Sequence, residues 1–519
     1  MTTLPSGLPV VVDRAGPVPL AVQISAQLQR AVTGGALRAG DRLPSSRDLA
    51  ATLGVSRTVV TNAYARLFAE GWLEGRHGSG TYVADVTPPP TPPLASGPAP
   101  MGSNALMAPI EAVECAYDPE GRPNERRGGG AVSPGAGPRG PVDQWPGLID
   151  RGLGVIDLQP GISWAEGIEP AVWRRAWRQA GAHLPSRWPD PHGLPELREE
   201  IAAYLRRSRG LAVTPAHVLV TQGVSNGLAL LADALLAPGD KAGIEEPGYP
   251  TGREVLHRAG ARVVPCRVDA HGIVPEELPG DLRLLYTTPA HQYPLGGRLP
   301  VSRRQALIAW ARATGALVIE DDYDSEFRYD VGPLPALHSM DPNVIVYLGT
   351  ASKVLATAFG AGWLVAPPDL VERLAALRPR LGARIPEPVQ HAILALLRSG
   401  DLERHVRKMR LEYARRRAAL VDGLTRGAPG EADGNPAPAS FRLLGDTAGM
   451  HVVLELPDDY PAVRLVEAAA QQGIAVYPLD RYFAGPPTMS GLVLGYGTAT
   501  LPQLRRAAAT LAPLLARLP

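Results

Sequence analysis

Residues 343–353 read NVIVYLGTASK, and this stretch decides the fold. Its β-branched apolar run, 344–346, is typical of a buried strand. The strand ends in a small turn that carries two hydroxyls, Thr350 and Ser352, and Lys353 follows them. The sequence therefore predicts a primary amine just past the carboxyl end of a buried strand, which is where open α/β sheets bind their ligands.

Lys353 is one of only three lysines in 519 residues, and arginine supplies almost every other positive charge. A lysine amine can form a Schiff base, whereas a delocalised guanidinium cannot. With flanking hydroxyls able to hold a phosphate, Lys353 suits covalent attachment of pyridoxal 5'-phosphate (PLP). The alternative is an ordinary solvated lysine, which is our interpretation of Lys241 and Lys408.

A second segment supplies groups for the cofactor ring. In GALVIEDDYDSEF, residues 315–327, an apolar strand ends in acids and an aromatic. A carboxylate at this point can keep the pyridine nitrogen protonated, and we assign that role to Asp321. Tyr323 can then donate its phenol to the O3' oxygen of the ring.

Two more segments predict groups for the phosphate and for the face of the ring. The segment HVLVTQGVSNG, residues 217–227, reads as a strand, a turn and the start of a helix. The backbone amides of Val224 and Ser225 then lie at a helix N-terminus, which is suited to an anion. Tyr249 lies in a Pro/Gly turn of EEPGYPTGR, where it either stacks on the ring or packs within the turn.

From about residue 157 to the end, the chain resembles fold-type I, class I aminotransferases. The similarity is narrower to the MocR/GabR-type transcriptional regulators, which join such a domain to a winged helix. It rests on four long motifs, WPDPHGLPELREEIAAYLRRSRGL, TPAHQYPLGG, EDDYDSEFRYD and YLGTASK. The resemblance implies an α/β domain with a mixed, mostly parallel sheet, helices on both faces and a smaller C-terminal α+β subdomain.

The resemblance also implies PLP as the cofactor, with Lys353 as its internal-aldimine lysine. Asp321 corresponds to the partner of the pyridine nitrogen, and Tyr323 corresponds to the O3' donor. Tyr249 corresponds to the residue that stacks on the ring. The phosphate-binding hydroxyls correspond to Thr350 and Ser352.

The N-terminal segment, residues 17–83, predicts three helices and a glycine-rich hairpin. The second helix has Ser45 as its N-cap and stops at Gly54, and the third begins after Ser56. These two short helices form a helix-turn-helix, and WLEGRHGSGTYV follows as a β wing. The inward faces are predicted to hold Ile24, Leu28, Val32, Leu49, Leu53, Val60, Ala63, Tyr64 and Leu67.

This segment is similar to the GntR family of winged-helix repressors, on LPSSRDLAATLGVSR and AYARLFAEGWLEGRHGSGTYV. The resemblance implies contacts with double-stranded operator DNA. Those contacts come from Arg47, Arg57 and Thr58, from Thr61 on the same outward face, and from His77 and Gly78 in the minor groove. Charge alone does not reveal a DNA-binding protein, because residues 1–85 carry eight arginines against six acidic residues.

The sequence predicts three parts: a winged helix over 1–85, a flexible linker rich in Pro and Gly over 86–150, and an effector and dimerisation domain over 151–519. With two cysteines, neither a disulfide framework nor a zinc cluster is expected, and we expect no metal. No apolar run of about 18 residues occurs, so we expect a cytoplasmic protein without a membrane partner.

The chain departs from aminotransferases where they bind the phosphate and the substrate. Gly360 replaces an arginine that pairs with the phosphate, seven residues after the Schiff-base lysine. Val224 and Ser225 replace a usual Ser/Thr and Gln. Val493 stands where an arginine clamps the substrate carboxylate, and Arg481 is nearby but outside that motif.

Three hypotheses follow. The first is a homodimeric, PLP-dependent transcriptional regulator that senses PLP or an amine or amino-acid effector. The second is an active aminotransferase that carries a DNA-binding domain, and the missing carboxylate arginine makes this activity uncertain. The third is a scaffold that binds DNA without a cofactor.

Overall fold

The computed structural model describes most of the chain outside the predicted linker. The described residues are 2–3, 9–14, 19–33, 36–70, 72–76, 80–84, 154–329, 335–383, 385–425, 441–445, 448–457 and 460–517. The predicted linker, 86–150, and the predicted DNA-contacting residues His77 and Gly78 lie outside them.

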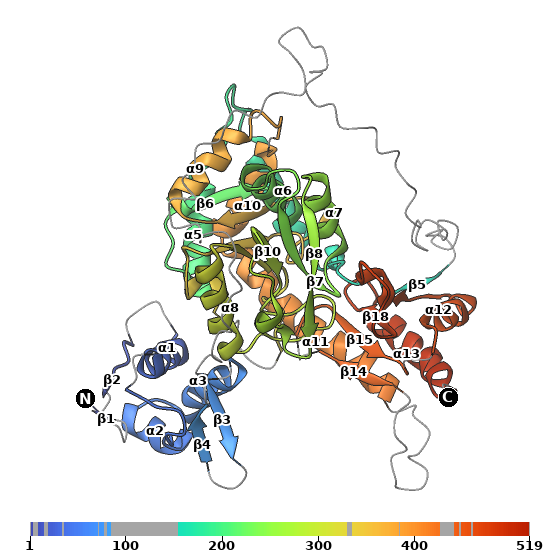
Figure 1. The fold of residues 1–519 in the computed structure, drawn as a ribbon, viewed down its shortest axis with the longest axis horizontal. Helices are drawn as coiled ribbons and strands as arrows, with labels where there is room; N and C mark the ends of the chain where they lie inside the picture. Colours follow the sequence, from blue (N-terminus) through green and yellow to red (C-terminus); the bar gives the residue numbers. More distant parts are fainter. Residues whose placement is uncertain are drawn as a thin grey trace.

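The N-terminal part forms the predicted winged helix-turn-helix (Figure 1). Its elements are β1 (Thr2–Thr3), β2 (Pro9–Val10), α1 (Leu20–Thr33), α2 (Ser46–Leu53), α3 (Arg57–Glu70) and the antiparallel wing strands β3 (Leu73–Arg76) and β4 (Gly80–Val83). Most of the predicted inward residues are buried, while Val32 and Leu53 are half-buried. The outward residues are exposed, namely Arg47, Arg57, Thr58 and Thr61.

Local sequence sets the ends of α2 as predicted. The Ser45 hydroxyl accepts the backbone N–H of Asp48 at 3.2 Å, which caps the first turn. Gly54 ends the helix with φ of 62°, a left-handed backbone that favours glycine. Because α3 then begins at Arg57, the two helices are joined by the short turn of a helix-turn-helix.

The large domain is built on an eight-stranded sheet with the order β6-β13-β12-β11-β10-β7-β8-β9. The pairing is parallel from β12 through β11, β10 and β7 to β8, whereas β13 runs antiparallel to β12 and β6, and β9 antiparallel to β8. This is the mixed, mostly parallel sheet that was predicted. Its strands are β6 (Val218–Thr221), β7 (Lys241–Glu246), β8 (Arg262–Asp269), β9 (Gly272–Ile273), β10 (Leu284–Thr287), β11 (Leu317–Asp322), β12 (Ile345–Thr350) and β13 (Gly362–Val365).

Helices cover both faces of this sheet, as the alternation along β12 shows. Val346 and Leu348 lie in an apolar cluster with α6 and α9, and Tyr347 lies in another cluster with α5, α10 and α11. The helices are α4 (Pro170–Gly181), α5 (Pro195–Arg209), α6 (Val224–Leu235), α7 (Pro250–Arg258), α8 (Val301–Thr314), α9 (Pro368–Leu377), α10 (Glu387–Arg398) and α11 (Asp401–Thr425).

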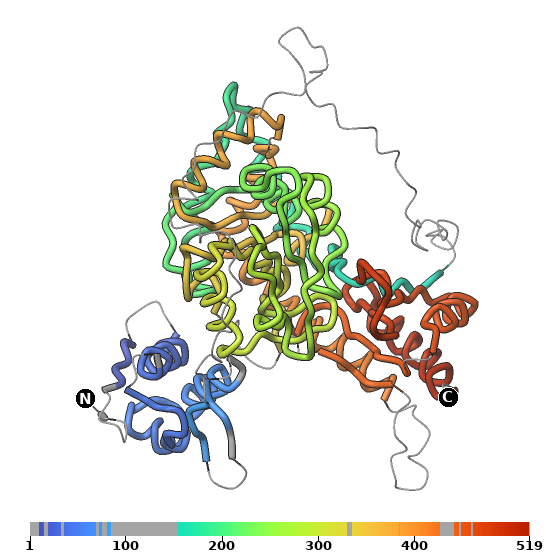
Figure 2. Tube along the Cα trace, in the orientation of Figure 1, coloured from blue at the N-terminus to red at the C-terminus, as the bar shows by residue number. Residues whose placement is uncertain are grey.

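A smaller α+β subdomain follows α11, as predicted. Its antiparallel sheet has the order β14-β15-β18-β17. In Figure 2 this subdomain, in orange and red, and the winged helix, in blue, lie on opposite sides of the large domain. The elements are β14 (Arg442–Leu444), β15 (His451–Glu455), α12 (Ala462–Gln471), β17 (Tyr477–Pro478), β18 (Gly491–Gly495) and α13 (Leu501–Leu515), and β16 (Ile474–Ala475) pairs with β5 (Ile156–Asp157).

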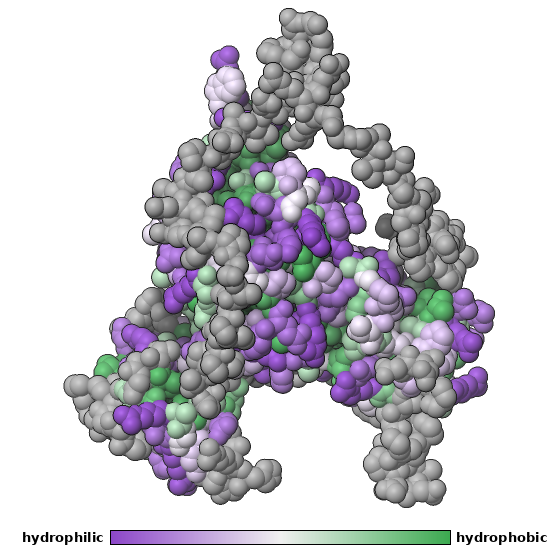
Figure 3. Space-filling view, in the orientation of Figure 1, coloured by the Kyte–Doolittle hydropathy of each residue, from purple (hydrophilic) through white to green (hydrophobic). Residues whose placement is uncertain are grey.

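The winged helix touches the large domain at the start of α8. Val301, the first residue of α8, is 2% exposed and belongs to the apolar core of the winged helix. Figure 3 shows mostly hydrophilic side chains over the middle of the large domain. Among the described residues, we find no helix with the length and apolar character needed to cross a membrane.

A buried ion-pair network fixes the segment that follows β11. Arg209, at the end of α5, is 1% exposed and donates from Nε to Asp322 Oδ2 at 2.6 Å. Its Nη2 lies 3.0 Å from Glu326 Oε1. Tyr347 donates its hydroxyl to Asp322 at 2.7 Å, and Tyr204 donates to Glu326 at 2.9 Å. These contacts hold both ends of the acidic segment against the sheet.

Removing this cation leaves two buried carboxylates with tyrosine hydroxyls but without their ion-pair partner. We therefore expect Arg209→Ala to lower the free energy of unfolding by about 3–5 kcal/mol. Arg207→Ala is the matched control, because Arg207 is half-exposed and pairs with Glu403 at 2.9 Å. This substitution should lower the free energy of unfolding by less than about 1 kcal/mol. Urea unfolding of both variants measures the difference. Equal losses would contradict a structural role for the network.

Candidate cofactor site and DNA interface

The cofactor site begins where β11 and β12 end. The two strands are parallel, with Asp321 opposite Leu348, and every residue in them is buried. Parallel strands bring their carboxyl ends to the same edge of a sheet. The acidic segment after Ile319 and the turn before Lys353 therefore meet there.

A cavity of about 300 Å³ lies at this edge. All eight residues predicted to hold the cofactor line it, from four separate segments of the chain. Its walls are Pro160, Gly161, Ile162, Gln222, Gly223, Val224, Ser225, Tyr249, Thr288, Tyr293, Asp321, Tyr323, Thr350, Ser352, Lys353 and Thr357. Sequence reasoning missed the 160–162 segment, because no local pattern marks it as close to Lys353, and it also missed Thr357.

Lys353 is half-buried, and it lines this cavity. Its Nζ donates to the backbone oxygen of Gly161. Burial lowers the pKa of Lys353, and the nearby carboxylates of Asp321 and Asp324 oppose that shift. A lowered pKa increases the neutral fraction of the amine, which is the form that attacks an aldehyde.

Asp321 offers an unused acceptor to the cavity. Tyr286 donates its hydroxyl to Oδ2, whereas the buried Oδ1 has no hydrogen-bond partner among the described residues. Burial raises the pKa of Asp321 to about 7. A buried oxygen without a partner is costly, and a protonated ring nitrogen is the kind of donor that satisfies it.

Tyr323 is positioned by a buried histidine and carboxylate. Its hydroxyl lies 2.9 Å from His291 Nδ1, which is itself 2.9 Å from Asp324 Oδ2. Burial raises the pKa of Tyr323 well above its ordinary value, so the phenol keeps its proton. His291 and Asp324 were not predicted, since their contact joins residues 33 positions apart.

Hydroxyls and a helix N-terminus gather at another part of the cavity. Gly223 has φ of 101° and precedes Val224, the first residue of α6. Ser225 lies 3.2 Å from the Tyr249 hydroxyl, atom to atom. Ser352 is close to Gly223, since a Cβ on that glycine would lie 4.0 Å from Ser352 Oγ. The arrangement suits a phosphate.

Known proteins resemble both parts of the chain. A family model described as aminotransferase class I and II matches residues 163–486, and one described as bacterial regulatory proteins, gntR family, matches residues 20–83. The chain is 36% identical over 491 residues to the HTH-type pyridoxine biosynthesis transcriptional regulator PdxR of Corynebacterium glutamicum, covering 95% of each chain. It is 30% identical over 493 residues to the probable rhizopine catabolism regulatory protein MocR of Rhizobium meliloti, covering 94% of this chain and 92% of that one.

The chain belongs to the MocR/GabR-type regulators. Its large domain belongs to the aminotransferase class I and II family and resembles an archaeal alanine:glyoxylate aminotransferase, with 25% identity, a TM-score of 0.64 and coverage of 71% of this chain and 92% of that one. The protein is thus a PLP-dependent, DNA-binding transcriptional regulator.

The residues of this regulator fit PLP. The unpaired Asp321 Oδ1 suits the ring nitrogen, Tyr323 is a phenol donor, and Lys353 is the amine for the aldehyde. When bound, PLP supplies an electrophilic aldehyde and an electron-withdrawing ring. The chain's own part is to orient the ring and to hold the Lys353 amine at the cavity wall through its contact with the Gly161 backbone oxygen.

The regulator's cavity contains no arginine among its described lining residues. Residues 357–359 form a short 3₁₀ helix, and Gly360 ends it with φ of 56° and open space around its Cβ position. Val493 is buried in the apolar core of β18, away from the cavity lining. The Arg481 guanidinium lies 5.3 Å from the Tyr477 ring centroid and does not line the cavity either.

If Lys353 binds PLP covalently, the protein loaded with PLP should show a visible absorbance band, and Lys353→Ala should abolish that band. The reason is that no other primary amine lines the described cavity. Lys408→Ala is the matched control, because its amine donates to the Gly167 backbone oxygen at 3.1 Å instead. Borohydride reduction followed by peptide mapping identifies the modified residue. Absence of a band and of an adduct on Lys353 would contradict covalent binding.

The buried carboxyl of Asp321 predicts a pH dependence of the cofactor-free protein. Its pKa is raised from 3.8 to about 7, so the folded state binds the proton more tightly than the unfolded state. The resulting stability is present below about pH 4 and is lost as the pH rises through about 7. The urea midpoint of wild type should therefore fall between pH 5 and pH 8. The midpoint of Asp321→Asn should fall less over the same range, because the variant lacks this titrating group. An equal fall in both proteins would show that Asp321 does not titrate in this way.

Proposed function

We propose that PLP is itself the effector, and that its binding at Lys353 changes how paired winged helices hold operator DNA. The observation that carries the proposal is a cavity with every group for the PLP ring and aldehyde but without an arginine for a substrate carboxylate among the described residues. Further support comes from the similarity to PdxR, which is named as a transcriptional regulator of pyridoxine biosynthesis.

The phosphate end of the cavity favours reversible binding. In this proposal the phosphate is held by hydroxyls and backbone amides alone. Gly360 supplies no guanidinium at the position where aminotransferases have an arginine. A charge-assisted hydrogen bond contributes about 1.5–3 kcal/mol, so PLP should leave more readily than from an aminotransferase. A sensor of PLP needs an effector that can dissociate.

The alternative is an active aminotransferase that carries a DNA-binding domain. Such an enzyme orients its amino-acid substrate through the carboxylate, usually with a bidentate arginine. The corresponding Val493 lies in an apolar core, and Arg481 stacks near Tyr477. The regulator without transaminase activity is therefore the function we propose.

A short segment offers a route from the cavity to the DNA-binding part. Thr288 and Tyr293 line the cavity, and the same segment reaches Val301, which packs in the winged-helix core. A ligand that moves this segment can change the packing of the winged helix, provided its affinity differs between the two arrangements.

The proposed assembly is a homodimer in the cytoplasm. Two-fold symmetry presents two winged helices to paired half-sites. The predicted linker over 86–150 is long enough, in this proposal, for each winged helix to reach its half-site. The proposed DNA contacts are Arg47, Arg57, Thr58, Thr61, His77 and Gly78.

The effector is tested by operator retardation with a duplex that the wild-type chain enriches from a random pool. PLP should change operator affinity by about fivefold or more. Amino acids should neither change the affinity nor convert the absorbance band of the bound cofactor. A working aminotransferase treated with the same amino acids serves as the positive control for conversion. Conversion of the cofactor by the chain would favour the aminotransferase alternative, whereas a change of operator affinity caused by an amino acid would contradict PLP as the effector.

A further inference from the structure

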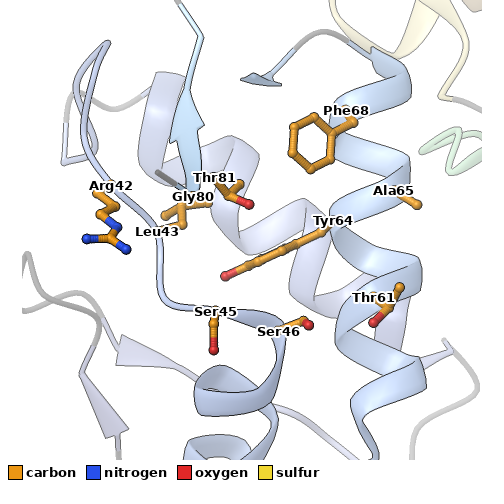
Figure 4. A pocket seen from close by; sticks show the side chains of 10 residues that line it. All are labelled: Arg42, Leu43, Ser45, Ser46, Thr61, Tyr64, Ala65, Phe68, Gly80 and Thr81. Carbon is orange, nitrogen blue, oxygen red and sulfur yellow. The ribbon is translucent and has the colours of Figure 1, made fainter. Parts of the chain in front are cut away.

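The winged helix contains a cavity of its own, between α3 and the wing. Its volume is about 370 Å³. Figure 4 shows Thr61, Ala65 and Phe68 of α3 on one side and Arg42 with Gly80 on the other. We call this space the wing cleft. None of the cofactor residues lies near it, so it is separate from the site described above.

Backbone contacts with the wing hold Arg42 at the rim of the wing cleft. Arg42 forms an antiparallel β-bridge with Tyr82, and the next residue, Leu43, donates its N–H to Thr81 O at 2.9 Å. Gly80 lets the side chain lie close to the wing, since a Cβ there would be 3.1 Å from Arg42 Nε. Arg42 is the only charged residue in the described lining.

The remaining lining combines hydroxyls with an apolar floor. Ser45 at the N-cap of α2, Ser46 in its first turn and Thr61 of α3 bring hydroxyls. The Tyr64 hydroxyl donates to the Pro44 backbone oxygen at 2.8 Å, so its ring presents an apolar face. Phe68 remains 38% exposed. A cation and hydroxyls beside apolar rings match a phosphate joined to a deoxyribose.

The docking geometry of a winged helix places a DNA strand at this point. The recognition helix of a helix-turn-helix enters the major groove, and the proposed contacts of His77 and Gly78 put the wing tip in the minor groove. One sugar-phosphate backbone separates these two grooves, so it must cross between α3 and the wing. The wing cleft opens there, and Thr61 on its wall already belongs to the outward face of α3.

We propose that the wing cleft seats one strand of the operator backbone, with Arg42 binding a phosphate and Phe68 packing against the adjoining sugar. The inference rests on the DNA-binding function and adds a contact that fixes register without reading bases. The sequence analysis predicted DNA contacts for Arg47 and Arg57 but not for Arg42. The position of Arg42 beside the wing depends on its β-bridge to Tyr82, which no local pattern predicts.

The test uses the full-length chain and the enriched duplex, in which a single uncharged methylphosphonate linkage is moved along each strand. One position should weaken wild-type binding about tenfold or more, because a charge-assisted contact is lost there. Arg42→Ala should bind the unmodified duplex about as weakly as wild type binds the duplex modified at that position. The methylphosphonate at that position should cause no further loss of affinity in Arg42→Ala. Arg42→Lys should regain sensitivity to the linkage.

Two matched variants separate the possible outcomes. Arg30→Ala, on α1 outside the wing cleft, should keep the wild-type profile. Arg57→Ala should change which sequences are enriched, whereas Arg42→Ala should enrich the same ones more weakly. If Arg42→Ala loses affinity at the same linkages and by the same factors as wild type, the wing cleft does not seat the strand. If wild type enriches no duplex, the DNA-binding function is overturned together with this inference.

Discussion

The parallel register of β11 and β12 is the constraint on which the rest of the molecule depends. It places Asp321 and Lys353 at one sheet edge, although each belongs to its own strand and turn. Close packing on both faces of the sheet fixes that register, because a slip by one residue would exchange Tyr347 with Val346 and Leu348 between two separately packed apolar clusters. The Arg209 network then holds the acidic segment in place.

The same burial sets the chemistry of the site. It lowers the pKa of Lys353 and raises the pKa of Tyr323 well above its ordinary value, so the cavity holds a reactive amine beside a phenol that keeps its proton. It also raises the pKa of Asp321 to about 7, so this carboxyl can ionise when a cationic ring nitrogen lies beside it. What the described cavity does not supply is an arginine for a phosphate or for a carboxylate. The site is thus suited to capture PLP and poorly suited to position an amino acid.

Sequence patterns predicted the elements better than the distant contacts. The N-cap at Ser45, the stop at Gly54 and the strand before Lys353 are local, and the structure confirms them. The contacts of Lys353 with Gly161 and of His291 with Asp324 join distant parts of the chain, and no periodicity reveals them. The roles assigned to the eight cavity residues remain predictions, although the structure brings all eight together.

The central claim is that one molecule carries two linked binding sites, and reciprocity tests it most directly. PLP is titrated into the wild-type chain, following the Lys353 absorbance band, without DNA and then with saturating operator. By linkage, DNA must change the PLP affinity by the same factor by which PLP changes the operator affinity. We predict two equal factors, each different from one. A PLP affinity that DNA leaves unchanged would contradict the account.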